Sequence, residues 1–204
     1  MAEWLRDNWF YAVAFVGACV VAFFAFRAAA KASAQHKKNY KAEEEYIKRL
    51  KALKEKYVPL KKQTIENAPD DELLEGTALG IQLFLQKQED MEKEFLSLSD
   101  EKKLIYTLDV FLSDKTLNSF FRSNTEILKS RLVPALSLVG LSKDAERILP
   151  VAKMFDDNDE DTSLDEKRVS QLDEQLETDG FLSSVKLAAA KYIKENAEVF
   201  VNGE

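Results

Sequence analysis

The chain has 204 residues, which is enough for one globular domain with an anchor but not for two full domains. Its charges are unevenly distributed, because residues 1–62 carry 13 Lys and Arg against 6 Asp and Glu, whereas the remainder carries 16 against 30. The single cysteine, Cys19, excludes an internal disulfide, and the 6 Gly and 4 Pro leave little room for long loops.

An apolar run comes first along the chain, since residues 9–26 contain no charged side chain. At a rise of about 1.5 Å per residue the run spans roughly 27 Å, close to the roughly 30 Å hydrocarbon thickness of a bilayer. Aromatic residues at its start are of the kind found where a span meets lipid headgroups. We therefore expect a transmembrane helix over residues 9–30, preceded by a short extracytoplasmic segment over residues 1–8.

Two other interpretations of this run stay open. Small residues at Ala30, Ala32 and Ala34 would suit a cleavable signal peptide, although the N-terminus lacks the positive region that such signals need. Cys19 follows a glycine and an alanine, as in a lipoprotein signal, although the apolar run continues beyond the cysteine. The uninterrupted length of the run favours a retained anchor over both.

Basic residues after the span set its expected orientation. They have no acidic residue among them, and by the positive-inside rule their side of the membrane is cytoplasmic. We expect a single-pass protein of the cell membrane, with the lipid bilayer as one partner and anionic headgroups against these side chains. The residues are Arg27, Lys31, Lys37, Lys38 and Lys41.

A stripe of small residues recurs at every fourth position of the span, at Ala14, Ala18 and Ala22. Small residues at this spacing let two helices approach closely, so the stripe is a candidate packing surface for a homodimer. Alanine is also common in such spans for no specific reason, and the sequence does not separate the two interpretations.

A basic helical stalk is expected over residues 31–59, which are rich in Lys, Glu and Ala and contain no glycine. Pro59 is expected to kink or end this helix. Apolar residues at positions 46, 50, 53, 57 and 60 follow a heptad spacing that is too short to establish a coiled coil. This seam would pair with a second copy or pack on the domain that follows.

The remaining residues, 60–204, predict an acidic, all-α soluble domain, because the apolar spacing is helical and no long stretch alternates with period two. Pro134 and Pro150 fall inside helical patterns and are expected to cause a kink or a late start. Leu117, Phe120 and Phe121 are expected to form a short apolar turn. Longer helices are expected near residues 70–85, 91–98, 100–112, 125–139 (ending before Gly140), 142–155, 164–176 and 181–201.

Catalytic and cofactor-binding patterns are not found. The one histidine, His36, lies in the stalk and the one cysteine lies in the apolar run, which excludes Cys–His and Ser–His pairs within the domain. Read as a calcium-binding EF-hand loop from Asp156, the acidic segment has Asp161 where glycine is required and Lys167 where glutamate is required. We therefore expect a non-enzymatic protein with no cofactor and no metal site.

Three segments between residues 98 and 201 carry a family likeness. They are a helix over 101–121 that ends in a phenylalanine pair, a leucine-rich helix with a glycine break over 132–155, and the terminal AAAKYIKENAEVF of 188–200. Together they resemble the C-terminal domain family of the bacterial DNA mimic proteins. The family's most specific motif, Asn-Gly-Gly-Phe followed by one residue and Gln, departs here to Asp114, Lys115, Thr116 and Leu117 with Ser119 in place of Gln.

The resemblance implies a helical domain whose carboxylates imitate the phosphates of duplex DNA and occupy a DNA-binding protein. Residues 156–179 contain 11 Asp and Glu against 2 basic residues, and a mimic needs a dense row, since duplex DNA carries one charge per roughly 1.7 Å of its axis. An acidic surface that merely keeps the domain soluble is the alternative. The candidate partner-binding residues are Asp156, Asp157, Asp159, Glu160, Asp161, Asp165, Asp173, Glu177 and Asp179.

These observations together predict a membrane-anchored interaction module without chemistry. Its acidic helical surface is expected to meet a cytoplasmic protein with a basic surface, for example a DNA-binding protein, and not to bind nucleic acid directly. The alternative is a structural accessory subunit of a membrane complex, assembled through the transmembrane helix and the stalk.

Overall fold

The computed structural model describes residues 44–155 and 165–201. The chain divides into two units, residues 1–51 and 52–204, and the described part of the first unit is helical. The predicted span over residues 9–30 lies outside the described residues, as do its alanine stripe and the basic residues that follow it. In the described ranges no helix combines the length and the apolar character needed to cross a membrane.

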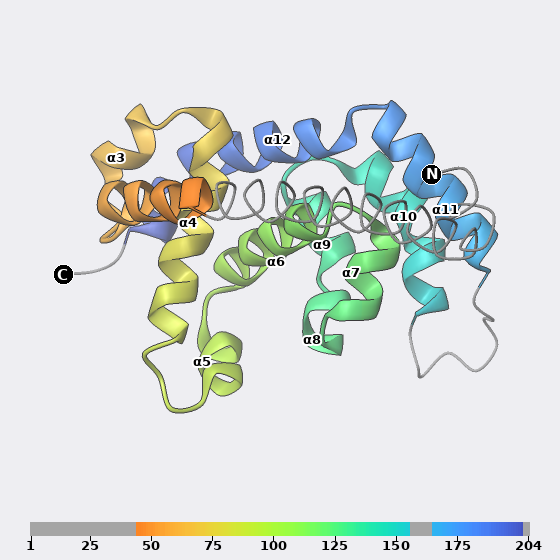
Figure 1. Ribbon diagram of the computed structural model, residues 1–204, viewed down its shortest axis with the longest axis horizontal. Helices are drawn as coiled ribbons and strands as arrows, with labels where there is room; N and C mark the ends of the chain where they lie inside the picture. Colours follow the sequence, from red (N-terminus) through yellow and green to blue (C-terminus); the bar gives the residue numbers. More distant parts are fainter. Residues whose placement is uncertain (1–43, 156–164, 202–204) are drawn as a thin grey trace, which may run out of the picture. The chain divides into compact units, whose positions relative to one another are not determined.

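The described residues contain helices and no strand, so the prediction of an all-α domain is confirmed (Figure 1). A helix over residues 44–57 comes first. It is followed by α3 (Lys62–Asn67), α4 (Asp70–Leu85), α5 (Met91–Ser97), α6 (Asp100–Asp114), α7 (Leu117–Ser123), α8 (Glu126–Lys129), α9 (Leu132–Leu138), α10 (Ser142–Met154), α11 (Glu166–Thr178), α12 (Phe181–Glu195) and α13 (Ala197–Phe200).

Side-chain caps explain where several of these helices begin. Asp90 caps α5, Ser99 caps α6, Thr116 caps α7 and Asp165 caps α11, each by accepting a hydrogen bond from the backbone N–H three residues later. A cap of this kind satisfies a backbone donor that the first helical turn leaves without a partner. Each of these four helices thus begins at a cap that its own local sequence supplies.

Two of the predicted helices are interrupted. The helix expected over residues 125–139 is two helices, because α8 ends at Lys129 and α9 starts at Leu132. Pro134 lies in the first turn of α9, where its missing N–H costs no helical hydrogen bond, so the predicted late start is confirmed. Pro150 lies inside α10.

The predicted terminal helix over residues 181–201 is likewise broken, into α12 and α13. Asn196 separates the two, and its side-chain amide donates to the carbonyl of Tyr192 at 2.9 Å, which satisfies a carbonyl at the end of α12. The short apolar turn expected at residues 117–121 is a complete helix, α7, extending to Ser123.

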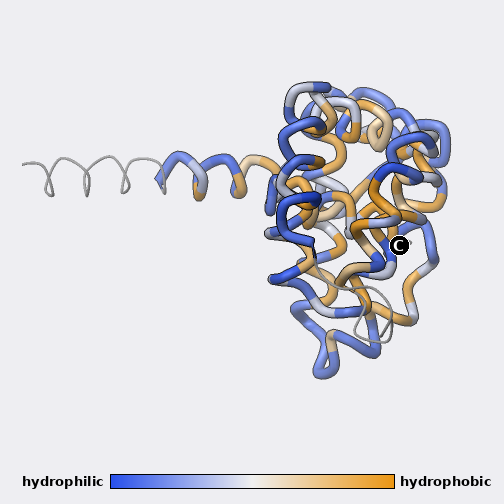
Figure 2. The backbone as a smooth tube through the Cα atoms, turned by 90° about the vertical axis from the view of Figure 1, so that its right-hand side faces the viewer, coloured by the Kyte–Doolittle hydropathy of each residue, from blue (hydrophilic) through white to orange (hydrophobic). Residues whose placement is uncertain are grey.

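One large hydrophobic core holds the domain together. The helix α6 lies between α4 and α9, while α12 packs along α4 and α10 packs on α9 (Figure 1). Figure 2 shows apolar and hydrophilic stretches alternating along the helical backbone of the domain. At the centre, the rings of Phe111 and Phe120 lie 5.7 Å apart, and those of Phe120 and Phe121 lie 5.4 Å apart. Aromatic side chains this well buried contribute roughly 1.5–3 kcal/mol each.

The C-terminal end of the predicted stalk belongs to this core. Leu53, Tyr57 and Leu60 are at most 3 % exposed, and the compact unit begins at residue 52. The seam therefore packs on the domain along these residues, and the helix ends at Tyr57, just before Pro59, as predicted. The Tyr57 ring lies on Gly76 of α4 so closely that a Cβ there would approach ring carbons to 2.5 Å.

A second, smaller cluster lies at the C-terminal half of α4. Ile81 and Leu85 of α4 and Phe95 of α5 are buried together, with Tyr106 of α6 and residues of α8 packed against them. Because this cluster contains few residues, it leaves large apolar side chains nearby exposed: Phe84 is 42 %, Met91 55 % and Leu96 46 % exposed. This corner of the domain positions the pockets considered below.

Candidate functional site

The carboxylates predicted to bind a partner fall into two groups. Asp156, Asp157, Asp159, Glu160 and Asp161 lie outside the described residues. Asp165, Asp173, Glu177 and Asp179 are described, and they lie on or beside α11.

Asp173 holds another helix in place. Its Oδ1 accepts a hydrogen bond from the backbone N–H of Leu117 at 2.7 Å, and its Oδ2 accepts one from Asn118 at 3.3 Å. These amides open α7, so the carboxylate acts as an N-terminal cap supplied from α11. Burial raises the pKa of Asp173, although both amide hydrogen bonds work in the opposite direction.

Asp179 joins α11 to α10. Its Oδ2 accepts a hydrogen bond from Arg147 Nη2 at 3.0 Å, and the same guanidinium bonds Asp144 at 3.2 Å. Glu166 similarly bonds Arg122 of α7 at 2.8 Å. Asp179 and Glu166 therefore serve contacts between helices.

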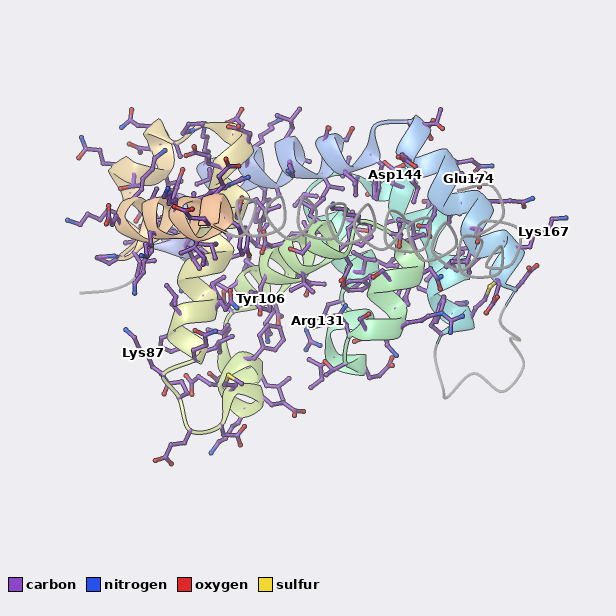
Figure 3. The ribbon with its side chains drawn as sticks, viewed as in Figure 1. Lys87, Tyr106, Arg131, Asp144, Lys167 and Glu174 are labelled. Atoms are coloured by element: carbon purple, nitrogen blue, oxygen red, sulfur yellow. The ribbon has the colours of Figure 1, made fainter. Side chains whose placement is uncertain are left out.

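The exposed face of α11 is consequently not a continuous acidic row. Glu174 and Glu177 are exposed, and within the described ranges their carboxylates have no partner. Lys167 and Arg168 share the exposed surface of the helix, and Figure 3 shows Lys167 projecting away from the helical body. Of the four described candidates, Glu177 alone has a carboxylate that is both exposed and unoccupied.

Removing the Asp173 carboxylate should measurably weaken the fold. We expect Asp173→Ala to lower the free energy of unfolding by about 1–2 kcal/mol, because two helix-opening amides lose their acceptor. Urea unfolding followed by circular dichroism measures the change. The matched control is Glu177→Ala on the same helix, which should shift stability by less than about 0.5 kcal/mol; equal effects of the two substitutions would contradict the capping role.

A second surface lies at the corner formed by α4, α5, α6 and α8. It contains an open pocket of about 400 Å³, within the roughly 300–1,000 Å³ typical of binding sites. The apolar part of the lining consists of Leu85, Met91, Phe95, Tyr106, Ile127 and Leu128, and the polar part of Gln82, Gln86, Glu92 and Thr125.

Several polar groups of this pocket are unoccupied. In the part of the chain that the structure describes, the Tyr106 hydroxyl has no hydrogen bond, and the Glu92 carboxylate has neither a hydrogen bond nor an ion pair. The same holds for the carboxylate of Glu89, an exposed residue that precedes α5 and lies outside the lining. Burial, with a smaller contribution from the nearby Asp109 carboxylate, raises the pKa of Tyr106 and keeps it protonated as a hydrogen-bond donor. Apolar walls with a few free polar groups are the usual composition of a binding pocket.

The pocket walls are held rigidly by contacts behind them. The centre of the Phe95 ring lies 5.7 Å from the centre of the Tyr106 ring. The Arg131 guanidinium lies over the Phe95 ring, 5.8 Å from its centre, in a cation–π contact. Figure 3 shows Tyr106 and Arg131 near one another between α5 and α8. Lys103 donates to the carbonyl of Leu96 at 3.2 Å, which fixes the end of α5. The pocket is therefore pre-formed.

This surface is absent from the sequence-based candidates. The sequence signal that points to it is the pattern EDMEKEFL, in which Met91 and Leu96 flank Phe95 among carboxylates. Because Phe95 alone faces the core, the other two apolar residues have no buried role. Two large apolar side chains next to Phe95 that one short helix does not bury are the signal that would have identified the surface.

Metal-binding geometry is not found in the described ranges, where no group of three or more His, Cys, Asp or Glu side chains could hold an ion. One titratable group stands apart: Asp109 of α6 has its pKa raised to about 7 by burial, with a further rise from Glu75 and a smaller opposing effect of Lys186. It lies on α6 close enough to Glu75 of α4 and Lys186 of α12 for their charges to act on its carboxyl group.

Comparisons with protein-family models, with curated proteins and with solved structures give no match to the chain. The likeness to the DNA mimic family thus stays a prediction from the three segments that carry it.

Proposed function

We propose that this chain is a membrane-anchored, non-enzymatic protein-interaction module whose helical domain binds a basic cytoplasmic protein. Its partner is of the DNA-binding class if the DNA mimic likeness extends to activity. The expected transmembrane helix over residues 9–30 supplies the anchor, and the basic residues from Arg27 to Lys41 would face the cytoplasm together with the domain.

The observation that carries the proposal is the pocket between α4, α5, α6 and α8. It pairs an apolar interior with the unoccupied Glu92 carboxylate, and Met91 at its edge is 55 % exposed. Exposed apolar side chains beside a pocket mark interaction sites in soluble domains. A small metabolite in the pocket would leave the exposed Leu96 of α5 uncovered, whereas a protein partner can cover it.

The partner best suited to this surface is an amphipathic helix with Lys or Arg beside its apolar stripe. Such a helix would place an apolar side chain in the pocket against Phe95 and Tyr106, and a cation near Glu92 and Glu89. The free carboxylates give charge complementarity, which raises association rates and disfavours acidic partners. Glu174 and Glu177 on α11 would steer the same partner from a distance.

Site-specific photocrosslinking in intact membranes tests the proposal. A photoreactive amino acid replaces Met91, Glu177 or Leu187, one at a time, in the full-length chain. Leu187 on α12 is the control, because it is 56 % exposed and lies outside both surfaces. We expect position 91 to capture a protein through a basic helical segment, with a yield that falls with salt.

Charge reversal then separates the two acidic surfaces. The double substitution Glu89→Lys and Glu92→Lys should lower the crosslinking yield at position 91 about tenfold. The double substitution Glu174→Lys and Glu177→Lys changes the net charge equally and should retain most of that yield. Capture mainly at position 177 would move the binding surface to α11, as a DNA mimic requires. Equal capture at all three positions would contradict a specific interaction, and a complex recovered intact by residues 1–60 alone would instead favour the structural accessory role.

A further inference from the structure

A second pocket lies on the other side of the C-terminal half of α4. It is open, has a volume of about 520 Å³, and is the size of a small-molecule site. Its lining comes from the two residues after the helix over residues 44–57, from the C-terminal half of α4 with Lys87 just beyond it, from Leu98 at the end of α5 and from Lys102 of α6. The apolar lining residues are Val58, Pro59, Ile81, Leu83, Phe84 and Leu98.

This pocket does not share its lining with the pocket that carries the proposed function. Leu83, Phe84 and Lys87 line this one, whereas Gln82, Leu85 and Gln86 of the same helical turns line the other. Figure 3 shows Lys87 at the end of α4 on the side away from Tyr106. The two sites can therefore be altered independently.

The polar side chains of the lining are two lysines, Lys87 and Lys102. In the described part of the chain neither ammonium group has a carboxylate partner. Other lysines of these helices do have one: Lys56 pairs with Glu72 at 2.6 Å and Lys103 with Asp100 at 2.8 Å. Two unpaired cations beside one apolar pocket leave a positive field that a ligand can neutralise.

The donors and acceptors of the lining define the ligand class. Lysine ammonium groups donate hydrogen bonds and accept none, and the other described side chains of the lining are apolar. A bound peptide would bring backbone N–H groups that find no side-chain acceptor, at a cost in free energy for each one buried. The fitting ligand has an apolar body and a head that only accepts hydrogen bonds and carries negative charge.

We infer that this pocket binds an amphiphilic carboxylate of the fatty-acid class. The acyl chain lies against Phe84, Ile81 and Leu98, and the carboxylate lies between Lys87 and Lys102. Each methylene fully buried in such a pocket lowers Kd roughly fourfold. The inference is independent of the proposed protein partner, which uses the opposite side of α4.

Photolabelling of the full chain tests the inference. The protein is reconstituted in phosphatidylcholine nanodiscs and exposed to dodecanoate carrying a diazirine in its chain, below its micellar concentration. Mass spectrometry maps the label to peptides. We expect label on the segments spanning residues 57–60, 80–87 and 98–102, with a yield about tenfold higher for the carboxylate than for the ammonium with the same chain.

Two pairs of substitutions with the same change in net charge supply the variant and its control. Lys87→Glu with Lys102→Glu should invert the headgroup preference, so that the ammonium probe labels the pocket more strongly than the carboxylate. Lys115→Glu with Lys143→Glu, at exposed sites outside the pocket, should leave the preference unchanged. Lys87, Lys115 and Lys143 are exposed and Lys102 is partly exposed, so both variants should fold, which circular dichroism checks.

Label that misses these segments, or a yield that does not depend on the headgroup, would overturn the inference. Photoreactive phosphatidylserine placed in the nanodisc tests whether the negatively charged ligand is a membrane lipid rather than a free fatty acid. If it labels the pocket while free dodecanoate does not, the ligand is a lipid headgroup and the assignment to a free fatty acid is wrong.

Discussion

Gly76→Ala should lower the free energy of unfolding by about 2 kcal/mol, although alanine is the better helix former by about 1 kcal/mol. Gly76 lies in α4 directly beneath the fully buried Tyr57 ring, and an added Cβ would lie 2.5 Å from two ring carbons. No real contact is that short, so either the ring or the backbone of α4 must move. Gly76→Val, which adds two further methyl groups, should cost more than 3 kcal/mol.

Gly80 provides the matched control, one helical turn further along α4. A Cβ there would meet the carbonyl oxygen of Tyr57 at 3.9 Å, an ordinary contact, so Gly80→Ala should stabilise the protein by about 0.5–1 kcal/mol. The same test includes Tyr57→Ala, which should remove the penalty of Gly76→Ala while itself costing about 3 kcal/mol or more. Thermal and urea unfolding of these variants measure the differences, and a penalty that persists without the Tyr57 ring would contradict the clash.

Helices could be predicted from the sequence wherever a core-facing stripe and a cap agree. In α6, Ile105, Leu108 and Phe111 are buried at helical spacing behind the Ser99 cap, and the predicted start is the observed one. The breaks at residues 130–131 and at Asn196 were missed. Apolar spacing continues across both, so only the local backbone conformation, which a periodicity does not encode, ends the helix there.

Carboxylate roles were harder to predict because they depend on contacts between distant residues. Asp173 binds Leu117, which is 56 residues away, and Asp179 binds Arg147, which is 32 residues away. From the sequence, both carboxylates are predicted to belong to an exposed acidic surface. Composition gives the total charge, but only the packing of α11 on α7 and α10 shows which carboxylates are already occupied. Conversely, the free carboxylates of Glu89 and Glu92 lie beside Met91 in a short segment. The number of charges in that segment does not set it apart from the rest of the acidic domain.

Asp109→Asn should raise the free energy of unfolding at neutral pH by about 2 kcal/mol. The carboxyl group lies partly buried on α6, close enough to Glu75 of α4 and Lys186 of α12 for their charges to act on it, and burial raises its pKa to about 7 from an ordinary 3.8. The fold therefore favours the protonated form, while the unfolded chain ionises freely above about pH 4. Ionisation in the unfolded chain costs the wild-type protein stability progressively as the pH rises from about 4 to about 7.

The asparagine variant cannot ionise, so its advantage over the wild type should be small at pH 4, grow through pH 5 and 6, and stay constant above about pH 8. Urea unfolding at each pH measures it. Glu177→Gln on the exposed face of α11 is the matched control and should change stability by less than about 0.5 kcal/mol. An advantage that is the same at pH 4 and pH 8 would mean that the gain arises from packing or hydrogen bonding of the amide. In that case the carboxyl group of Asp109 would ionise in the folded protein much as it does in the unfolded chain.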